Sequence, residues 1–296
     1  MIDAVDVRVP ASTSNLGPGY DVLGMALSLY ANFHFQKSAE LTVKGCPSQF
    51  CNADNLVLQA FRLVYEKAQE TAPVVALTID SDVPVARGLG SSSTCIVAGL
   101  AAANAFLDNR FTPYELFEFC TEIEGHPDNA APAVFGGLTA SFMHEGHAKT
   151  VPFAPHEAWR FVAVIPDYEV KTSEARKIVK KDIDLSSAVH SVSHALAMVR
   201  GLETGDEALV KAACEDCLHE PYRRTLIKEF DQLKALAQAS GAATFFISGS
   251  GSTVIAATMH EEVAKAYAER VKRIWPSFGV KILQVCHEGA VVQSQD

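Results

Sequence analysis

Alternating apolar and polar positions predict two strands near the start of the chain. Apolar residues recur at every second position over 5–9 and again over 27–35, which is the period of a half-buried strand. Pro10 is expected to close the first strand. The polar, glycine-punctuated segment 11–21 is then expected to be a long loop between the two strands, and a loop this rich in polar side chains often carries function.

The remaining periodicity predicts helices and strands in both halves of the chain. Helical spacing predicts helices over 54–68, about 95–105, 113–124, 173–181, 185–202, 206–219, 225–240 and 261–274. Strands are expected over 75–80, 138–142, 161–165 and 280–285, and two more flank a Gly/Ser loop within 244–255. The polar stretch 144–156 marks the expected boundary between a domain of residues 1–150 and one of residues 151–296.

Composition restricts the classes of function. The 296 residues are 48% hydrophobic, enough for a substantial core, and the net charge is −10. Because the chain has no basic run, nucleic acid and anionic membranes are poor candidate partners. No stretch approaches the about 20 apolar residues of a membrane span, and the N-terminus lacks a signal-peptide pattern, so a cytoplasmic location is expected. The seven scattered cysteines are an odd number, which indicates reduced thiols.

Two motifs of the second half carry little functional weight. Cys214 and Cys217 form a CxxC, but it falls inside a predicted helix and has no second pair. His190 and His194 are four residues apart on another predicted helix. Without a third ligand or a glutamate base, a surface or packed pair is the better interpretation.

A glycine-rich turn precedes the buried helix expected near residue 95. The sequence Gly-Leu-Gly-Ser-Ser-Ser-Thr over 88–94 places hydroxyls where that helix begins, and the unpaired N–H groups of a helix start favour phosphate. The segment lacks the lysine of a P-loop and the third glycine of a dinucleotide fingerprint. An ordinary strand-to-helix turn remains an equal alternative.

A second polar cluster lies at the exit of the helix that begins with the capping box Thr112–Glu115. Glu124, His126, Asp128 and Asn129 fall within six residues there, and an apolar segment follows them. Apolar surroundings favour a metal or substrate site over a solvated helix end.

Four segments together resemble the GHMP-type small-molecule kinases and, among these, the homoserine kinases. They are VPASTSNLGPGYDVLGMAL (9–27), PVARGLGSSST (84–94), EGHPDNAAPAVFGG (124–137) and SGSGSTV (248–254). The first and third are more specific than a glycine loop, and galactokinases and mevalonate kinases share the second and fourth but open differently. The resemblance implies a two-domain α+β fold, with an N-terminal ribosomal-S5-like α/β domain and a C-terminal ferredoxin-like α+β domain.

The resemblance also implies a phosphotransferase that uses ATP and Mg²⁺. Ser92 and Glu124 would hold the metal, and Asn55 would lie near the adenine. The other residues implied to bind ATP are Pro84, Arg87, Gly88, Leu89, Gly90, Ser91, Ser92, Ser93, Thr94, Gly249 and Gly251.

The implied acceptor is L-homoserine, a zwitterion whose ammonium needs an anion and whose carboxylate needs arginine. The implied substrate-binding residues are Asn15, Asp21, His126, Asn129, Arg176 and Arg223. Asp21, Glu124 and Asn129 are the candidate catalytic residues, with Asp21 expected to bind the ammonium before acting as a base. For either arginine, an ordinary exposed helix charge is the alternative.

In this interpretation the homoserine δ-hydroxyl attacks the γ-phosphate in line and yields O-phosphohomoserine for threonine biosynthesis. A homodimer is expected by resemblance. A kinase for another small alcohol and a catalytically silent ligand sensor remain alternatives.

The sequence departs from the family pattern at three positions. Ser250 and Ser252 replace the usual Ala and Pro of the fourth motif, and the loss of the proline is expected to free that loop. Lys171 adds a cation near the expected carboxylate pocket.

Overall fold

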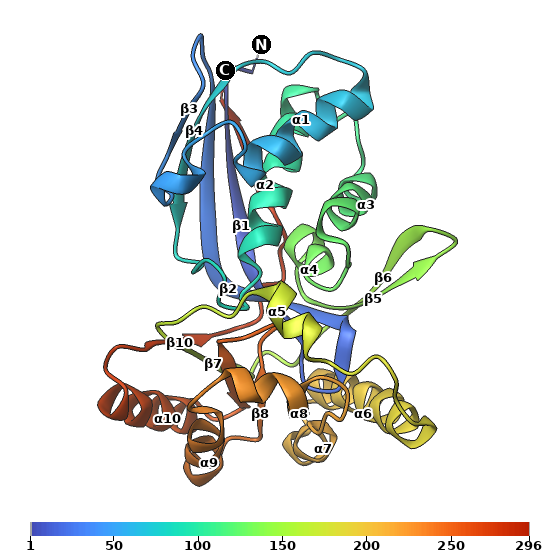
Figure 1. Ribbon diagram of the computed structural model, residues 1–296, viewed down its shortest axis with the longest axis vertical. Coiled ribbons are helices and arrows are strands. Elements are labelled where there is room, and N and C mark those ends of the chain that lie inside the picture. The colour runs from blue at the N-terminus through green and yellow to red at the C-terminus, as the bar shows by residue number, and fades with distance from the viewer. Residues whose placement is uncertain (1, 296) are drawn as a thin grey trace.

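The computed structural model describes residues 2–295, which form two β-sheets flanked by helices (Figure 1). The first sheet has the order β11-β1-β2-β4-β3, and β5 and β6 extend it from β2. Its strands are β1 (Ala4–Asn15), β2 (Gly19–Lys37), β3 (Thr42–Lys44), β4 (Val75–Ser81), β5 (Leu138–His144), β6 (His147–Phe153) and β11 (Val291–Gln295). The second sheet has the order β10-β7-β9-β8 and comprises β7 (Arg160–Ile165), β8 (Thr244–Ile247), β9 (Val254–Thr258) and β10 (Gly279–Leu283).

The helices divide between the two sheets. The first four α-helices lie together on one side of the first sheet, while α9 and α10 lie below the second sheet in the view of Figure 1. Those near the first sheet are η1 (Ser48–Phe50), α1 (Leu56–Ala68), α2 (Ser91–Phe106), α3 (Pro113–Glu124) and α4 (Ala130–Phe135). The others are α5 (Thr172–Lys177), α6 (Leu185–Thr204), α7 (Glu207–Ala213), α8 (Glu220–Arg223), η2 (Arg224–Leu226), α9 (Phe230–Ser240) and α10 (Glu261–Ile274).

Helix α2 is the central helix of the first half, because it is buried along almost its whole length from Ser93 to Ala105. Small side chains let its neighbours approach closely. A side chain at Gly99 would collide with the carbonyl oxygen of Val57 in α1. The apolar run after the glycine-rich turn is therefore a core helix that packs closely against α1.

The second sheet is covered on both faces. Along β7, Phe161 and Ala163 belong to the main core that also fills the first half, whereas Val162 and Val164 pack in a separate cluster with α9 and α10. This division follows from the two-residue period of a strand. It explains why β7 is apolar at every central position, as the sequence predicted.

The largest departure from the sequence prediction is at the N-terminus. Strand β1 does not stop at Pro10 but continues to Asn15, with an irregular register between Pro10 and Ala11. A bulge tolerates a residue without an N–H. The expected loop 11–21 is therefore wrong, and residues 16–18 alone form the turn between β1 and β2.

Smaller departures lie in the second half. The expected helix 206–219 ends at Ala213, so the CxxC motif lies outside it, and the expected helix 173–181 ends at Lys177. The helix expected from 225 begins only at Phe230, after a 3-10 turn. The helix predicted over 261–274 and the capping box of α3 are confirmed.

The expected domain boundary lies in structured chain. Within the polar stretch 144–156, residues 147–153 form β6, which pairs with β5 in the first sheet. Strand β11 was not predicted, and it pairs antiparallel with β1. The end of the chain thus returns to the first sheet, while a division at residue 150 stays a prediction.

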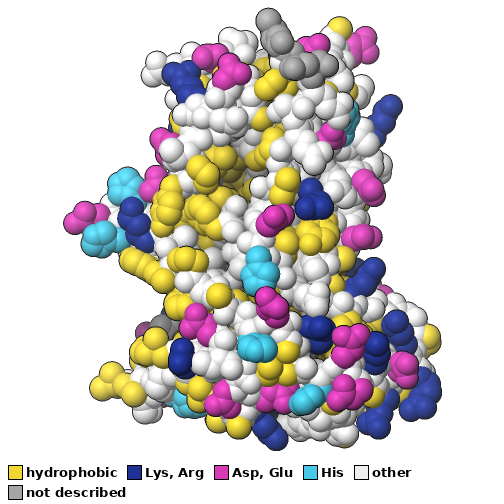
Figure 2. Space-filling view, turned by 180° about the vertical axis from the view of Figure 1, so that it is seen from behind, with side chains coloured by type: hydrophobic (Ala, Val, Ile, Leu, Met, Phe, Trp, Pro, Cys, Tyr) yellow, Lys and Arg dark blue, Asp and Glu magenta, His cyan; other side chains and the backbone are white. Residues whose placement is uncertain are grey.

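The surface has mixed charge. Figure 2 shows lysines and arginines interspersed with aspartates and glutamates over the lower half of one face, and apolar side chains gathered in its upper half. Among the described residues, no helix has the length and apolar character needed to span a membrane.

Candidate active site

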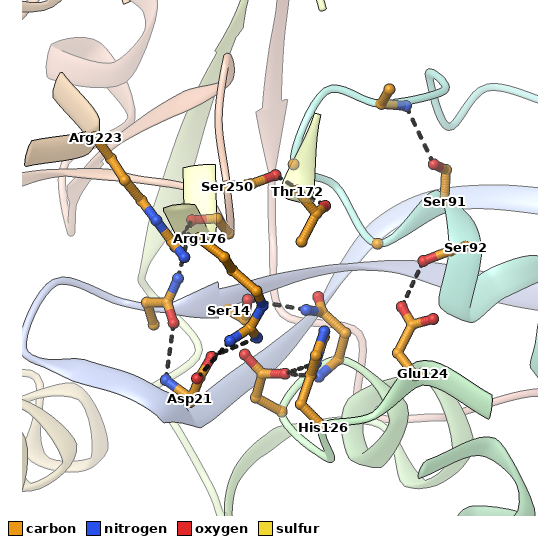
Figure 3. Close-up of a pocket in the computed structure, with 17 residues that line it drawn as sticks. Ser14, Asp21, Ser91, Ser92, Glu124, His126, Thr172, Arg176, Arg223 and Ser250 are labelled. Carbon is orange, nitrogen blue, oxygen red and sulfur yellow. Dashed lines mark hydrogen bonds and ion pairs between the residues drawn. The ribbon is translucent and has the colours of Figure 1, made fainter. Parts of the chain in front are cut away.

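A polar cavity of about 220 Å³ lies where elements of both halves meet (Figure 3). It collects side chains from the β1–β2 region, the glycine-rich turn, the exit of α3, helix α5, helix α8 and the loop between β8 and β9. Its lining residues are Ser14, Asn15, Asp21, Ala86, Gly88, Gly90, Ser91, Ser92, Glu124, His126, Asp128, Asn129, Thr172, Arg176, Arg223, Gly249 and Ser250. The cavity therefore unites all six predicted substrate-binding residues with the glycine-rich turn.

The glycines of this turn are required by close packing. Gly88 and Gly90 have φ of +77° and +70°, a region that favours glycine. A side chain at Gly90 would collide with the hydroxyl of Ser12, and one at Gly88 with the carbonyl oxygen of Ser248. Gly90 is the N-cap of α2 and gives it no side-chain hydrogen bond. The first N–H groups of the helix are thus left for an anionic ligand.

Glu124 faces the start of α2 across the cavity. It is the last residue of α3, which ends at Gly125 in a left-handed conformation. The hydroxyl of Ser92 donates to Oε1 of Glu124, and the hydroxyl of Ser93 donates to the same oxygen over 3.0 Å. A carboxylate beside hydroxyls is a hard oxygen donor set, which fits Mg²⁺.

Asp21 and Arg176 form a two-pronged ion pair across the cavity (Figure 3). The guanidinium of Arg176, on α5, donates to both carboxylate oxygens of Asp21 over 2.9 and 2.8 Å. Burial opposes the charged form of Arg176, but the hydrogen bond and charge of Asp21 outweigh it and raise the pKa of the arginine. Asn15 fixes this region, since its Oδ1 accepts from the Asp21 amide and its Nδ2 donates to Gly249.

The polar residues after α3 form one connected network. His126 Nδ1 lies 2.6 Å from Asp128, whose carboxylate is buried. Burial opposes both charges, yet their hydrogen bond and mutual attraction raise the pKa of His126 and lower that of Asp128. Asn129 donates to the hydroxyl of Ser14 and accepts from that of Ser12, each over 2.9 Å. The network fixes the amide of Asn129 against β1.

Arg223 is not an exposed helix charge. Only 2% of it is exposed, and its guanidinium donates to the carbonyl oxygens of Ala175 and Gly249 over 3.2 and 2.9 Å. It also lies 5.0 Å from the ring centre of Tyr20, a cation–π distance. Because burial disfavours its charge, the pKa of Arg223 is lowered. An anion in the cavity would offset that cost.

A second cavity, of about 500 Å³, adjoins the first beside α1 and β4. Its walls include apolar side chains such as Phe33, Phe50 and Ile79, and it shares Ala86, Ser91, Ser92 and Thr172 with the first cavity. The two cavities thus meet at the N-terminus of α2. An apolar cavity that opens onto the unpaired N–H groups of a helix start has the chemistry to take a nucleotide base.

Asn55 and Pro84 line the second cavity. The side chain of Asn55 is already engaged, because its Oδ1 accepts from Val57 as the N-cap of α1 and its Nδ2 donates to Phe50. Thr94 also lines this cavity, and its hydroxyl donates to the Ser91 carbonyl within α2.

Three predicted ATP-binding residues occupy supporting positions. Arg87 donates to the backbone of Pro166 and Asp167 and pairs with Glu169 over 3.5 Å. It therefore ties the glycine-rich turn to the second half of the chain. Leu89 is fully buried beneath the turn, and Gly251 packs against Ile227.

Sequence reasoning did not select Ser14, Thr172 and Ser250 as site residues, although all three line the first cavity. Ser14 lies inside the first motif, and Thr172 immediately precedes the segment that carries Arg176. Ser14 is buried, whereas Thr172 is exposed and its hydroxyl lies 3.4 Å from that of Ser250. What the three share is a position at the wall of the cavity, and this exists only in the folded chain.

The fourth motif is held more firmly than its sequence suggested. The expectation that Ser252 frees the loop is wrong, because this buried serine donates to the carbonyl oxygen of Tyr168 over 2.7 Å. The next residue, Thr253, donates its N–H to Arg87. Lys171 is exposed at the start of α5.

Comparison with known proteins agrees with this geometry. The family described as GHMP kinases N terminal domain matches residues 55–137, and the one described as GHMP kinases C terminal matches residues 198–277. A homoserine kinase of Clostridium beijerinckii is 41% identical over 254 residues, which is 85% of this chain and 85% of the relative. One from Clostridium botulinum (strain Alaska E43 / Type E3) is 34% identical over 298 residues and covers 99% of each chain.

A solved structure extends the likeness to three dimensions. The crystal structure of homoserine kinase from Cytophaga hutchinsonii has a TM-score of 0.89 at 28% identity, and the match covers 99% of this chain and 98% of that one. The predicted family, the two-domain GHMP kinase fold and the kinase class of activity are thereby confirmed. The chain belongs to the homoserine kinase family of the GHMP kinases.

Proposed function

We propose that this enzyme transfers the γ-phosphoryl group of ATP to the side-chain hydroxyl of L-homoserine and forms O-phospho-L-homoserine, a step of threonine biosynthesis. The observation that carries the proposal is the Asp21–Arg176 pair in the polar cavity, beside the glycine-rich turn. A zwitterionic amino acid presents an ammonium and a carboxylate, and these can replace the two partners' bonds to each other. A plain hydroxy acid would leave Asp21 without a cation.

ATP would occupy the second cavity with its base and the start of α2 with its phosphates. The shared wall of the two cavities, formed by Ala86, Ser91, Ser92 and Thr172, is where the γ-phosphate would face the acceptor hydroxyl. The amide groups at the start of α2 would bind phosphate oxygens, and the helix dipole would favour their charge. Positioning and charge stabilisation account for most of the catalysis in phosphoryl transfer.

The metal proposal rests on the donor set of Ser92 and Glu124. When bound, Mg²⁺ supplies positive charge to the β- and γ-phosphate oxygens. Ser92 and Glu124 already meet through a hydrogen bond, so little movement separates this arrangement from one that holds an ion. Ser93, which also donates to Glu124, would keep the carboxylate oriented.

The acceptor would lie between Arg176, Arg223 and the residues after α3. Arg223, whose buried charge lacks a carboxylate partner among the bonds described above, suits the substrate carboxylate together with Arg176. Asp21 suits the ammonium. Asn129, fixed by Ser12 and Ser14, and the His126–Asp128 pair would orient the hydroxyl. In-line attack then requires no strong general base in this scheme.

The proposal is tested by ADP release with Mg-ATP against L-homoserine, L-threonine, L-serine, mevalonate and galactose. Turnover with L-homoserine well above the other four is the expected result. If another small alcohol is the preferred acceptor, the family assignment stands and the proposed substrate is wrong. Silence with every acceptor, together with tight ATP binding, would indicate a ligand sensor.

The metal assignment has a matched control on the same helix end. Glu124→Ala is expected to lower kcat by at least about a hundredfold, because several kcal/mol of charge stabilisation are lost. Glu122→Ala should retain activity, since Glu122 pairs with Lys67 on the surface. Equal activity of the two variants, across a titration of Mg²⁺, would refute the role of Glu124.

We further propose that the protein is a homodimer formed through α6. Leu185, Val189, Val192 and Leu196 are exposed on this helix, Leu196 by 69%. Their spacing of four, three and four residues is that of a coiled-coil seam, which a second copy of the helix can cover. The cytoplasmic location stays a prediction.

The dimer proposal is tested by light scattering after size-exclusion chromatography. Leu196→Glu should convert a dimer of the wild type to a monomer, because a charge in the seam has no partner. Ile274→Glu adds the same charge at an apolar position of α10 that is 51% exposed and should leave the dimer intact. A monomeric wild type would refute the proposal.

A further inference from the structure

Two histidines of α6 and a glutamate after α7 come together away from the kinase site. His190 and His194 lie one helical turn apart, and their rings stack at 3.7 Å between centroids. One ligand atom from each of His190, His194 and Glu215 can be chosen so that all three lie within 4.8 Å of one another. We propose that these residues form a binding site for a divalent transition-metal ion such as Zn²⁺.

The hydrogen bonds of the two imidazoles support this proposal. Nε2 of His190 lies 3.2 Å from the carbonyl oxygen of Glu215, and Nδ1 of His194 lies 3.1 Å from that of Ala213. A carbonyl oxygen only accepts, so each of these nitrogens carries the proton. The other nitrogen, Nδ1 of His190 and Nε2 of His194, then offers a lone pair in the plane of its ring. Because the rings are stacked with 23° between their planes, one ring must turn before both lone pairs reach the same ion. Metal-binding histidines are typically held in this way by a backbone carbonyl.

The donor set selects a particular class of ion. Two imidazoles and one carboxylate suit Zn²⁺ and its neighbours in the first transition row, and they leave a fourth position for water. Imidazole is a poor ligand for Mg²⁺, which prefers oxygen. The α6 site and the Ser92–Glu124 pair are therefore expected to bind different metals. The third ligand was missed in the sequence because Glu215 is 21 positions from His194 and was placed inside a helix.

The ion would join α6 to the segment that leads into the kinase site. Glu215 precedes Asp216, whose carboxylate accepts the N–H groups of Leu218, His219 and Glu220. This turn leads directly to α8, which carries the buried Arg223. A metal at His190, His194 and Glu215 would therefore fix one end of the segment that positions Arg223.

The test is a Zn²⁺ titration of untagged full-length protein in competition with a colorimetric chelator. The wild type is expected to bind one Zn²⁺ that the double variant His190→Ala/His194→Ala does not bind. His147→Ala is the matched control, because this exposed histidine pairs with Glu118 far from the site in sequence. Equal binding by the wild type and the double variant would overturn the proposal, as would loss of binding in the control.

Thermal unfolding gives a second readout that is independent of kinase activity. Zn²⁺ should raise the Tm of the wild type and leave that of the double variant unchanged, because only the native site binds the ion. If the double variant is already destabilised without metal, the Glu215→Gln variant provides the test of Zn²⁺ binding. That variant keeps both histidines, and it should weaken Zn²⁺ binding at least about tenfold if the carboxylate is a ligand. Unchanged binding by Glu215→Gln would overturn the three-ligand site.

Discussion

At the scale of single residues, the site is distinguished by charges that are held in place before any ligand binds. Asp21 has a φ of +55°, an uncommon conformation for a residue with a side chain. It is held there by Asn15 and by the bidentate contact with Arg176. The pair keeps both charges satisfied in the cavity, and a zwitterionic substrate can exchange with it at little cost in unpaired charge.

The first prediction concerns this pair. Asp21→Asn should raise the KM for L-homoserine by about tenfold to a hundredfold, because a charged hydrogen bond is worth about 1.5–3 kcal/mol. The KM for ATP should change little, since Asp21 does not line the second cavity. Steady-state kinetics with each substrate varied in turn measures both constants. An equal rise in the two KM values would mean that Asp21 supports the whole site instead of the ammonium subsite.

Glu220 carries the second prediction, on pH dependence. It is buried at the start of α8, where Lys234 of α9 lies 3.6 Å away and the Ile247 amide lies 3.4 Å away. Burial raises the pKa of Glu220; Lys234 and the Ile247 amide oppose this shift, and Asp216 adds to it. The native protein thus holds the proton more tightly than the unfolded chain. The contribution of Glu220 to stability is complete at pH values below its pKa in the unfolded chain. It is lost as the pH rises through the higher pKa that Glu220 has in the native protein.

Glu220→Gln should therefore become more stable relative to the wild type as pH rises from about 4 to about 8. Urea unfolding of both proteins across that range measures the difference, and effects of other groups cancel in it. A difference that is constant with pH would show that the carboxyl of Glu220 has an ordinary pKa in the folded protein.

At the scale of elements, helices and strands were predicted best from the sequence where one hydrophobic periodicity runs without interruption. Helix α10 and the capped start of α3 were predicted correctly because apolar spacing and end signals agree. Strand β1 was cut short at Pro10 because a proline and five polar or small residues look like a loop. In the folded chain these residues are buried, since Ser12, Ser14 and Asn15 pair with other site residues.

The site was predictable to the extent that its residues lie in contiguous motifs. The segments 84–94 and 124–137 bring Ser92 and Glu124 together, as the family resemblance implied. Arg223 was different, because nothing local to the sequence of α8 indicates burial. Its position depends on contacts with Tyr20, Ala175 and Gly249, which come from distant parts of the chain.

The third prediction separates backbone strain from collision at the glycine-rich turn. Gly90→Ala places a methyl group against the Ser12 hydroxyl, in a backbone conformation with φ of +70°. Gly146→Ala imposes a similar conformation, with φ of +83°, in a place where no atom lies within 4 Å. The left-handed conformation alone costs about 1–2 kcal/mol, so both variants should lose that much stability.

Gly90→Ala should lose more stability than Gly146→Ala, and it should also raise the KM for ATP by displacing the start of α2. Chemical denaturation and ATP kinetics of the two variants provide the comparison. Equal effects of the two substitutions on stability and on ATP binding would show that the turn accommodates a side chain at Gly90.

At the scale of the whole molecule, the two halves are interlocked through their shared core and through the chain end. Residues of β7, β8 and β9 contribute Phe161, Phe246 and Ile255 to the core that also fills the first half. The N- and C-terminal strands lie side by side at the far end of the first sheet (Figure 1). Strand β11 escaped prediction because its pattern is short and polar, and its partner β1 is the most distant segment in the sequence.

The last prediction tests whether this returning strand stabilises the half that carries the glycine-rich turn. In β11, Val291 to Gln295 pair with Arg8 to Ala4 of β1, and β1 continues to Ser12 and Ser14 at the cavity. Ending the chain after Gly289 removes the whole ladder. At about 0.5–1.5 kcal/mol for each backbone hydrogen bond, several kcal/mol of stability should be lost. Ending it after Val292 keeps the pairs with Arg8 and Val7 and should give an intermediate Tm.

Because β1 carries Ser12 and Ser14, the protein that ends after Gly289 should lose kinase activity at a lower temperature than the wild type. If its Tm equals that of the full chain, the first sheet is stable without its last strand, and the edge of β1 tolerates exposure to solvent.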